Sequence, residues 1–314
     1  MDNREILVSI RCLAYNQVRY IRQCLDGFVM QKTNFRFEAI VHDDASTDGT
    51  TEIIKEYAEK YPDIIKPIYE KENQYSKDFS VIDSLVRKAC VGKYLAFCEG
   101  DDFWTDPLKL QKQVDILETN PDVTFVHTAF SNVDMNGHIF HRKQYEYYQK
   151  ISRCGSVLPL LLKQNYVMTM SLCIRNEIME SRILINCPQK MDYAYTLACA
   201  SLGKAYYLPE NTCCYRMNPA GAMATSSSSV HKISRQIFLY FAQLYTDRKI
   251  TKLRKIEDIK AKHEILIKCL GMLKAKLNEE EVHKFLQTHK QLFFLLPSAS
   301  VIALYRQIIV KLHR

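Results

Sequence analysis

The sequence lacks the short motifs that identify several common enzyme classes. No G-x-x-x-x-G-K-[ST] or G-x-G-x-x-G segment occurs, so neither a P-loop nor a dinucleotide-binding fingerprint is present. The histidines show no H-E-x-x-H spacing and the cysteines no C-x-x-C pair, so a zinc site is not indicated. No G-x-S-x-G marks a serine nucleophile. A phosphate-bearing ligand would have to be held by side chains and a cation.

Glycine and proline are scarce, with 9 of each in 314 residues, which argues against collagen, repetitive β-folds and long flexible linkers. The chain is 47% hydrophobic, so it can bury a sizeable core without disulfides or metal. No run approaches about 18 consecutive apolar residues, and the charged N-terminus does not suit a signal peptide. We expect a helix-rich α/β protein in the cytoplasm, with most of its 11 cysteines buried as thiols.

Short β-rich runs alternate with helical stretches from residue 6 to residue 130. Strands are predicted at Ile6–Ile10, Phe37–Val41, Ile64–Tyr69, Tyr94–Cys98 and Val123–Phe130. Helices are predicted near Gln17–Met30, Thr50–Tyr61, Val81–Cys90 and Leu108–Thr119. This alternation predicts right-handed crossovers and a mainly parallel sheet sandwiched by helices. Ligands of such sheets bind beyond the carboxyl ends of the strands.

The pattern loosens between residues 131 and 229, which we interpret as an elaboration of the same sheet. The predicted elements are a hairpin around Asn136-Gly137, a strand over Met168–Ile174, a helix over Asp192–Leu202, and short strands over Ala205–Leu208 and Cys213–Met217. The serine run at 226–229 is the best linker candidate. We therefore expect a first domain over residues 1–225 and a helical extension over residues 230–314.

The C-terminal extension carries the positive charge of the chain. Residues 230–314 hold 17 Lys and Arg against 7 Asp and Glu, and helices are predicted over Ile233–Tyr245, Leu253–Leu277 and Glu280–Leu292. Apolar residues with flanking cations from Gln291 onward suit a helix at an anionic inner membrane surface, and equally the core or a homo-oligomer seam. Nucleic-acid binding is an alternative for the same charge, but we do not expect it because no recognised nucleic-acid module is present.

Polar segments follow three of the predicted strands and would converge on one rim of the sheet: Ala14-Tyr15-Asn16, His42-Asp43-Asp44 and Glu99-Gly100-Asp101-Asp102. Two adjacent carboxylates repel each other and are costly to desolvate unless a cation shares them. Asp101-Asp102 therefore predicts a Mg²⁺ or Mn²⁺ site that also takes substrate phosphates, or else the polar start of a helix. Asp44 could accept a base N–H or a ribose hydroxyl, and Tyr15 is either a stacking surface or an ordinary aromatic.

In this order and spacing the segments resemble a bacterial family 2 glycosyltransferase. The match spans residue 5 to about residue 220 and is carried by Tyr15-Asn16, Asp43–Thr50, Glu99–Trp104 and Asp106–Lys109. The resemblance implies an A-type glycosyltransferase fold and a nucleotide-sugar donor bound at the strand ends. It also implies transfer with inversion to a hydroxyl of a glycan or lipid-linked acceptor, in surface polysaccharide synthesis.

The resemblance further implies roles for individual residues. Tyr15 and Asp44 would bind the base, Asp101 the ribose, and Asp102 the metal ion. Asp192, at the start of a predicted helix, would be the general base that accepts the acceptor's proton. A helix cap is the other role that suits Asp192.

Two positions depart from the family pattern. Related sequences often have a histidine two residues after an arginine, where this chain reads Arg216-Met217-Asn218. Asn218 offers an amide oxygen as a third metal ligand, and Arg216 would help to neutralise the departing diphosphate. Leu13-Ala14 replaces the more usual Pro-Thr before Tyr15. A non-catalytic nucleotide-sugar-binding protein of the same fold and a nucleotidyltransferase remain alternatives.

Overall fold

The computed structural model of the chain describes residues 5–75, 77, 79–218, 233–234, 236–238 and 240–241. It divides into two units, residues 1–157 with 166–237 and residues 158–165 with 238–314. The described part of the second unit contains helix α6 (Leu158–Lys163). The described residues between 233 and 241 are helical, whereas the helices predicted over Leu253–Leu277 and Glu280–Leu292 lie outside the described residues, as does the apolar segment after Gln291. The predicted boundary at 225–230 stays a prediction.

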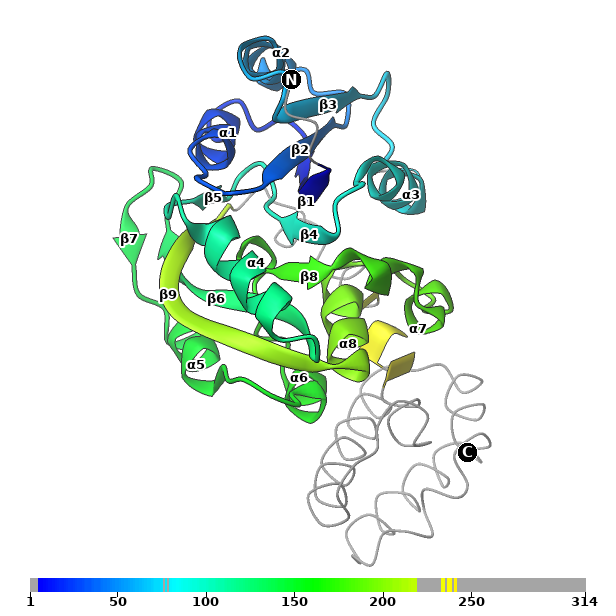
Figure 1. The fold of residues 1–314 in the computed structure, drawn as a ribbon. Helices are drawn as coiled ribbons and strands as arrows, with labels where there is room; N and C mark the ends of the chain where they lie inside the picture. The colour runs from blue at the N-terminus through cyan, green and yellow to red at the C-terminus, as the bar shows by residue number, and fades with distance from the viewer. Residues whose placement is uncertain are drawn as a thin grey trace, which may run out of the picture. The chain divides into compact units, whose positions relative to one another are not determined.

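Four parallel strands form the N-terminal half of one sheet, in the order β3-β2-β1-β4. They are β1 (Ile6–Ala14), β2 (Arg36–Asp43), β3 (Ile65–Tyr69) and β4 (Tyr94–Phe97). The connecting helices are α1 (Ile21–Val29), α2 (Thr50–Lys60) and α3 (Phe79–Ala89). Figure 1 shows α1 and α2 on one side of these strands and α3 on the other. The α/β fold expected from the alternating pattern is thus confirmed.

The remaining strands extend this sheet with mixed directions. They are β5 (Phe103–Trp104), β6 (Val123–Val133), β7 (Ile139–Phe140), β8 (Cys173–Arg175) and β9 (Lys204–Arg216). Strand β8 runs antiparallel to both β4 and β6, β9 runs parallel to β6, and β5 runs antiparallel to β9. Residues 131–218 therefore elaborate the same sheet, as expected. The hairpin predicted at Asn136-Gly137 joins β6 to β7.

Several elements differ from the sequence prediction. Strand β9 is continuous over 13 residues, because a register shift between Leu208 and Asn211 accommodates Pro209 without ending the pairing with β6. The predicted strand over Met168–Ile174 begins with a 3₁₀ turn, Thr169–Ser171, so only its end enters the sheet. Strand β5, with two residues, and helix α5 (Lys143–Ile151), which is mostly polar, gave no periodic signal.

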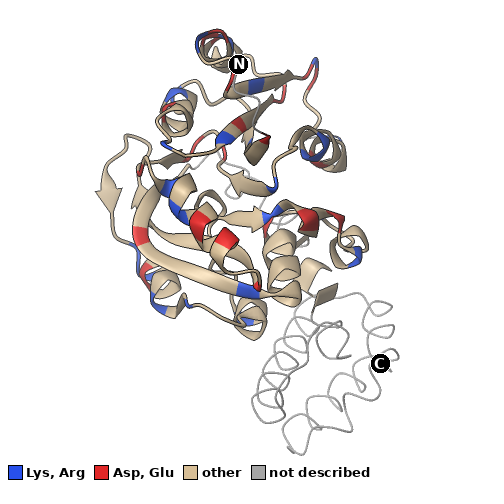
Figure 2. Cartoon of the chain, viewed as in Figure 1, with Lys and Arg blue, Asp and Glu red and all other residues tan. Residues whose placement is uncertain are grey.

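The other helices are α4 (Lys109–Thr119), α7 (Arg182–Ile185) and α8 (Asp192–Leu202), and a second 3₁₀ helix spans Asn176–Glu180. Helix α8 is buried from Tyr193 to Ser201, so only its two end residues, Asp192 and Leu202, reach the surface of the first unit. Figure 2 shows the charged residues mainly on helices and loops, while β6 carries none. None of the helices in the described ranges is long and apolar enough to cross a membrane.

The described cysteines are all free thiols, and Cys154 is the exposed one among them. The Sγ atom of Cys24 lies 4.0 Å from those of both Cys12 and Cys98, directly beneath the ends of β1 and β4. Burial raises the pKa of Cys98 to about 12 and that of Cys24 well above its usual range. The prediction of buried, unreactive thiols is confirmed for the described positions other than Cys154.

We expect Gly92→Ala to destabilise the sheet, because Gly92 lies where the chain entering β4 passes close to β1. A Cβ atom at this position would lie 2.5 Å from Ser9 N and 2.7 Å from Val8 C, both of them backbone atoms that cannot move aside. The free energy of unfolding should fall by about 1–3 kcal/mol, measured by urea denaturation. The control is Val91→Ala at the adjacent, exposed position, which should change it by about 0.5 kcal/mol or less. Equal losses would contradict the close approach.

Candidate active site

The carboxyl ends of β1, β2 and β4 lie next to one another and carry the polar segments found in the sequence. The amide of Asp44 donates to Ala14 O at 3.0 Å, and the amide of Gly100 donates to Leu13 O at 3.0 Å. These bonds continue the parallel pairing beyond the strands themselves. The predicted residues at this rim are Tyr15, Asp44, Asp101 and Asp102.

The loops after β1 and β2 are fastened to each other. The amide of Asn16 donates to Ser46 Oγ at 2.9 Å, and Asn16 Oδ1 accepts from the amide of Thr47 at 2.8 Å. Asn16 and Ala45 both have positive φ angles, 50° and 60°, a conformation that is unusual for residues with a Cβ and that concentrates at binding sites. Tyr15 stands at the edge of these loops with 47% of its surface exposed, so its ring is accessible to a ligand.

Asp44 is buried and holds the loop that follows β3. One of its carboxylate oxygens accepts from the amide of Gln74 at 2.7 Å and the other from the amide of Tyr75 at 3.0 Å. A carboxylate offers about four acceptor sites, so the two hydrogen bonds from backbone amides leave sites free for a ligand. The base contact predicted for Asp44 stays a prediction, and the loop-anchoring contacts are an additional role that the sequence did not reveal.

Asp101, Asp102 and Asn218 come together although 116 positions separate Asp102 from Asn218 in the chain. The amide of Arg216 donates to Asp102 Oδ1 at 2.8 Å, and Asn218 Nδ2 donates to Asp101 Oδ2 at 3.2 Å. Burial raises the pKa of Asp102 well above its usual range, and the neighbouring Asp101 charge adds to the increase. Burial also raises the pKa of Asp101. The two carboxylates therefore lack sufficient neutralising charge from the protein alone.

Arg216 is buried beneath this pair. Its guanidinium nitrogens donate to three acceptors: Asp101 O at 2.9 Å, Asp134 O at 3.1 Å and Gln23 Oε1 at 2.6 Å. The guanidinium also lies over the rings of Tyr20 and Phe103, 4.7 Å and 5.2 Å from their centroids. Arg216 thus fixes the Asp101-Asp102 turn relative to β9, while the predicted contact with a diphosphate stays a prediction.

The residues at this turn fit a hard divalent cation. Two carboxylates and a side-chain amide supply oxygen donors, which Mg²⁺ and Mn²⁺ prefer. A cation bound at Asp102 would offset the burial and the Asp101 charge, which both raise the pKa of this carboxyl group. No group of three or more His, Cys, Asp or Glu side chains arranged to hold a metal occurs in the described part of the chain. Water and ligand phosphates would have to complete the shell of such an ion.

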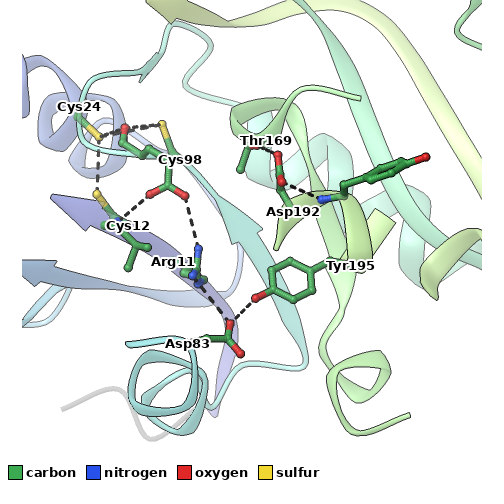
Figure 3. Close-up of polar contacts among 11 residues, drawn as sticks. Arg11, Cys12, Cys24, Asp83, Cys98, Thr169, Asp192 and Tyr195 are labelled. Atoms are coloured by element: carbon green, nitrogen blue, oxygen red, sulfur yellow. Dashed lines mark hydrogen bonds and ion pairs between the residues drawn. The ribbon is translucent and has the colours of Figure 1, made fainter. Parts of the chain in front are cut away.

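Asp192, the predicted base, is the first residue of α8. Its Oδ2 accepts from the hydroxyl of Thr169 at 2.8 Å, and its Oδ1 accepts from the amide of Tyr193 at 2.8 Å (Figure 3). The second bond joins adjacent residues in the first turn of α8, whose N-cap is Met191 without a side-chain cap bond. The structure therefore does not give Asp192 the capping role, and its catalytic role stays a prediction. Electrostatic interactions of Asp192 with Glu99 and Tyr75 indicate that it faces the same rim as the strand ends.

A buried cluster that the sequence analysis did not identify lies behind the rim. Arg11 Nη1 lies 3.4 Å from Glu99 Oε1, and its Nη2 lies 3.9 Å from Asp83 Oδ1. The hydroxyl of Tyr195 donates to Asp83, and its ring stacks on Phe97 at 5.7 Å (Figure 3). One sequence signal was available, because Arg11 is the single charged residue in the otherwise mostly apolar strand β1.

Glu99 connects this cluster to the rim. Burial raises the pKa of Glu99 to about 7, and the charges of Asp101 and Asp192 act in the same direction. The Arg11 charge and a hydrogen bond from the amide of Leu13 oppose the increase. Glu99 therefore interacts electrostatically with both Asp101 and Asp192.

A model of the family described as glycosyl transferase family 2 matches residues 9–176. The chain belongs to this family. An uncharacterized protein of Mycobacterium tuberculosis is 37% identical to this family 2 chain over 215 residues, which are 68% of this chain and 60% of that protein. The chain thus spans 60% of the length of this curated relative.

Two further proteins are similar to this family 2 chain. The putative teichuronic acid biosynthesis glycosyltransferase TuaG of Bacillus subtilis is 31% identical over 137 residues, 44% of this chain and 52% of that protein. The crystal structure of S. aureus TarS residues 1–349 in complex with UDP-GlcNAc matches with a TM-score of 0.62 at 16% identity, over 93% of this chain and 82% of that chain. This last likeness confirms the A-type glycosyltransferase fold.

We expect Arg216→Met to destabilise the protein strongly, because it leaves three hydrogen-bond acceptors without their donor. The free energy of unfolding in urea should fall by about 3–5 kcal/mol, since each acceptor left unpaired costs about 1–3 kcal/mol. The matched control is Arg22→Met, which removes the exposed ion pair with Glu56 and should cost about 1 kcal/mol or less. A similar small loss for both variants would show that Arg216 does not hold β9 to the Asp101-Asp102 turn.

Proposed function

We propose that the protein is a metal-dependent, inverting glycosyltransferase that moves a sugar from a nucleoside diphosphate sugar to a hydroxyl group. The observation that carries this proposal is the convergence, in a family 2 chain, of four features on one rim. These are an accessible aromatic ring, a buried carboxylate with remaining acceptor capacity, a buried pair of aspartates, and a further aspartate at a helix start: Tyr15, Asp44, Asp101-Asp102 and Asp192.

In this proposal, each residue of the rim contacts a different part of the donor. The ring of Tyr15 would stack on the base, Asp44 would accept a base N–H, and Asp101 would accept a ribose hydroxyl. Asp102 and Asn218 would hold Mg²⁺ or Mn²⁺, which when bound neutralises the charge of the diphosphate. Arg216 adds positive charge from below and keeps the two aspartates in place.

Asp192 would act as the general base of a single displacement. Its carboxylate accepts the proton of the acceptor hydroxyl while that oxygen forms a bond to the anomeric carbon. The bond from this carbon to the diphosphate breaks, and its electron pair leaves with the nucleoside diphosphate. The hydroxyl of Thr169 orients the carboxylate for this step, because it donates to Asp192 Oδ2.

The acceptor in this proposal is a glycan or a lipid-linked glycan of a surface polysaccharide. The name of the relative TuaG, a putative teichuronic acid biosynthesis glycosyltransferase, supports this class of product. The basic composition of residues 230–314 supports a cytoplasmic protein at the anionic inner face of a membrane, where lipid-linked acceptors are presented.

A non-catalytic nucleotide-sugar-binding protein is the second candidate. It is favoured by one observation, the presence of Asn218 where related sequences often have histidine. An amide is a weaker metal ligand than imidazole and cannot carry a proton.

Nucleotide binding should depend on a divalent cation. Calorimetry with UDP and with GDP should show an affinity that EDTA lowers, because the two aspartates then repel the diphosphate. Asp102→Asn should weaken binding by about tenfold or more even with Mn²⁺ present, since it removes a charged ligand of the cation. The control Asp115→Asn changes an α4 carboxylate whose hydrogen-bond partner in the described part of the chain is Gln111, and this variant should bind like the wild type. Equal affinities with and without metal for every variant would refute the metal site.

Asp192→Asn should leave nucleotide affinity nearly intact and abolish most transfer, because an amide keeps the shape but cannot accept a proton. The rate of UDP or GDP release from the donor should fall by about 10²–10⁴-fold. Asp122→Asn, which removes the exposed pair with Lys204, is the control for loss of a surface carboxylate. A wild-type rate for Asp192→Asn would show that Asp192 is not the base. A wild-type protein that binds donors without any turnover would favour the second candidate.

A further inference from the structure

Glu99 has hydrogen-bond partners inside the protein, and its side chain is partly exposed to solvent. Its Oε1 lies 3.4 Å from Arg11 Nη1, and its Oε2 accepts from the amide of Leu13 at 3.1 Å. The side chain is nevertheless 31% exposed at the end of β4. Each oxygen thus has one inner partner and remaining acceptor capacity, since a carboxylate offers about four acceptor sites.

Arg11 is a buried cation that holds the Glu99 carboxylate from the inner side. It is 3% exposed, and within the described residues its Nε and Nη2 atoms make no hydrogen bond. Burying a guanidinium is costly unless nearby carboxylates compensate, and here Glu99 and Asp83 do so. The hydroxyl of Tyr195 fixes Asp83 from α8, the helix that begins with Asp192 (Figure 3). The cluster therefore sets the position of Glu99 relative to the candidate base.

The location of Glu99 determines which part of a donor it can reach. It lies on the chain just before the Asp101-Asp102 turn, where the diphosphate would bind, and it interacts electrostatically with Asp192. In a single displacement the anomeric carbon lies between the leaving diphosphate and the attacking hydroxyl. The sugar ring of the donor must therefore occupy the space between the Asp101-Asp102 turn and Asp192, next to Glu99.

We propose that Glu99 binds hydroxyl groups of the sugar carried by the donor, and that Arg11 is the positioning residue that holds Glu99 for this contact. The inference rests on the proposed function and adds to it the residue that selects the sugar. Neutral sugars with adjacent hydroxyls are the expected ligands, because a fixed carboxylate accepts two such hydroxyls side by side.

The test compares nucleotides with and without a sugar on Glu99→Gln. The probes are UDP, UDP-GlcNAc, GDP and GDP-mannose, measured by calorimetry with Mn²⁺. Glu99→Gln should keep the affinity for the free nucleotide and weaken the matching sugar nucleotide by about tenfold or more, the effect of losing a hydrogen bond to a charged group. Arg11→Met should reproduce the selective loss, and Arg11→Lys should restore part of it because the positive charge remains.

The matched control is Glu180→Gln, which removes another carboxylate paired with a partly buried arginine, Arg87. It should leave all four affinities unchanged. Thermal unfolding confirms that each variant is folded, and Glu99→Asp, which keeps the charge but shortens the side chain, replaces Glu99→Gln if the latter does not fold. If Glu99→Gln weakens the affinity for nucleotide and sugar nucleotide equally, or weakens neither, the inference about Glu99 is wrong while the proposed function still stands. Failure of the wild type to bind any nucleotide would refute the proposed function as well.

Discussion

The balance of charge at the carboxyl ends of the strands is the constraint on which the rest of the structure depends. Carboxylates gather there from three elements: Asp44 after β2, Glu99, Asp101 and Asp102 after β4, and Asp192 from α8. Burial raises the pKa of Glu99, Asp101 and Asp102. Two buried arginines oppose this charge from below, Arg11 on β1 and Arg216 at the end of β9. The charge at the site is thus balanced by residues from strands that lie far apart in the sequence.

This arrangement explains why the half of the sheet with mixed strand directions is needed. Strands β1 to β4 by themselves would place Asp101 and Asp102 at a rim without Arg216 or Asn218. Strand β9 brings both residues there because it pairs with β6 along most of its length and with β5 directly after the aspartate turn. The two residues of β5 position the turn, since Phe103 pairs with Cys214 two residues before Arg216.

The sequence predicted the parts of the fold that repeat and missed those that depend on distant partners. Strands β1 to β4 and helix α8 have hydrophobic patterns that are long enough to be recognised. The sequence therefore predicted all five elements, with differences at the ends of the strands. Strand β5 is too short to show a period, and the continuity of β9 through Pro209 depends on a register shift against β6. The aspartates of the rim were found because they follow strands, whereas Glu99 and Arg11 were given no role because their pairing joins β4 to β1 in space.

The contacts of Asp44 show how such a rim can be prepared before a ligand arrives. Both of its carboxylate oxygens already accept hydrogen bonds from the backbone amides of Gln74 and Tyr75. These bonds offset the free-energy cost of removing the charge from water, and they form when the loop folds. In the proposed function, a base N–H that binds later would gain a charge-assisted hydrogen bond to an oriented acceptor. Arg11 and the amide of Leu13 hold Glu99 in the same way. The carboxylates of Asp44 and Glu99 are therefore fixed by the fold, and the aspartate pair is the part that a cation would complete in this proposal.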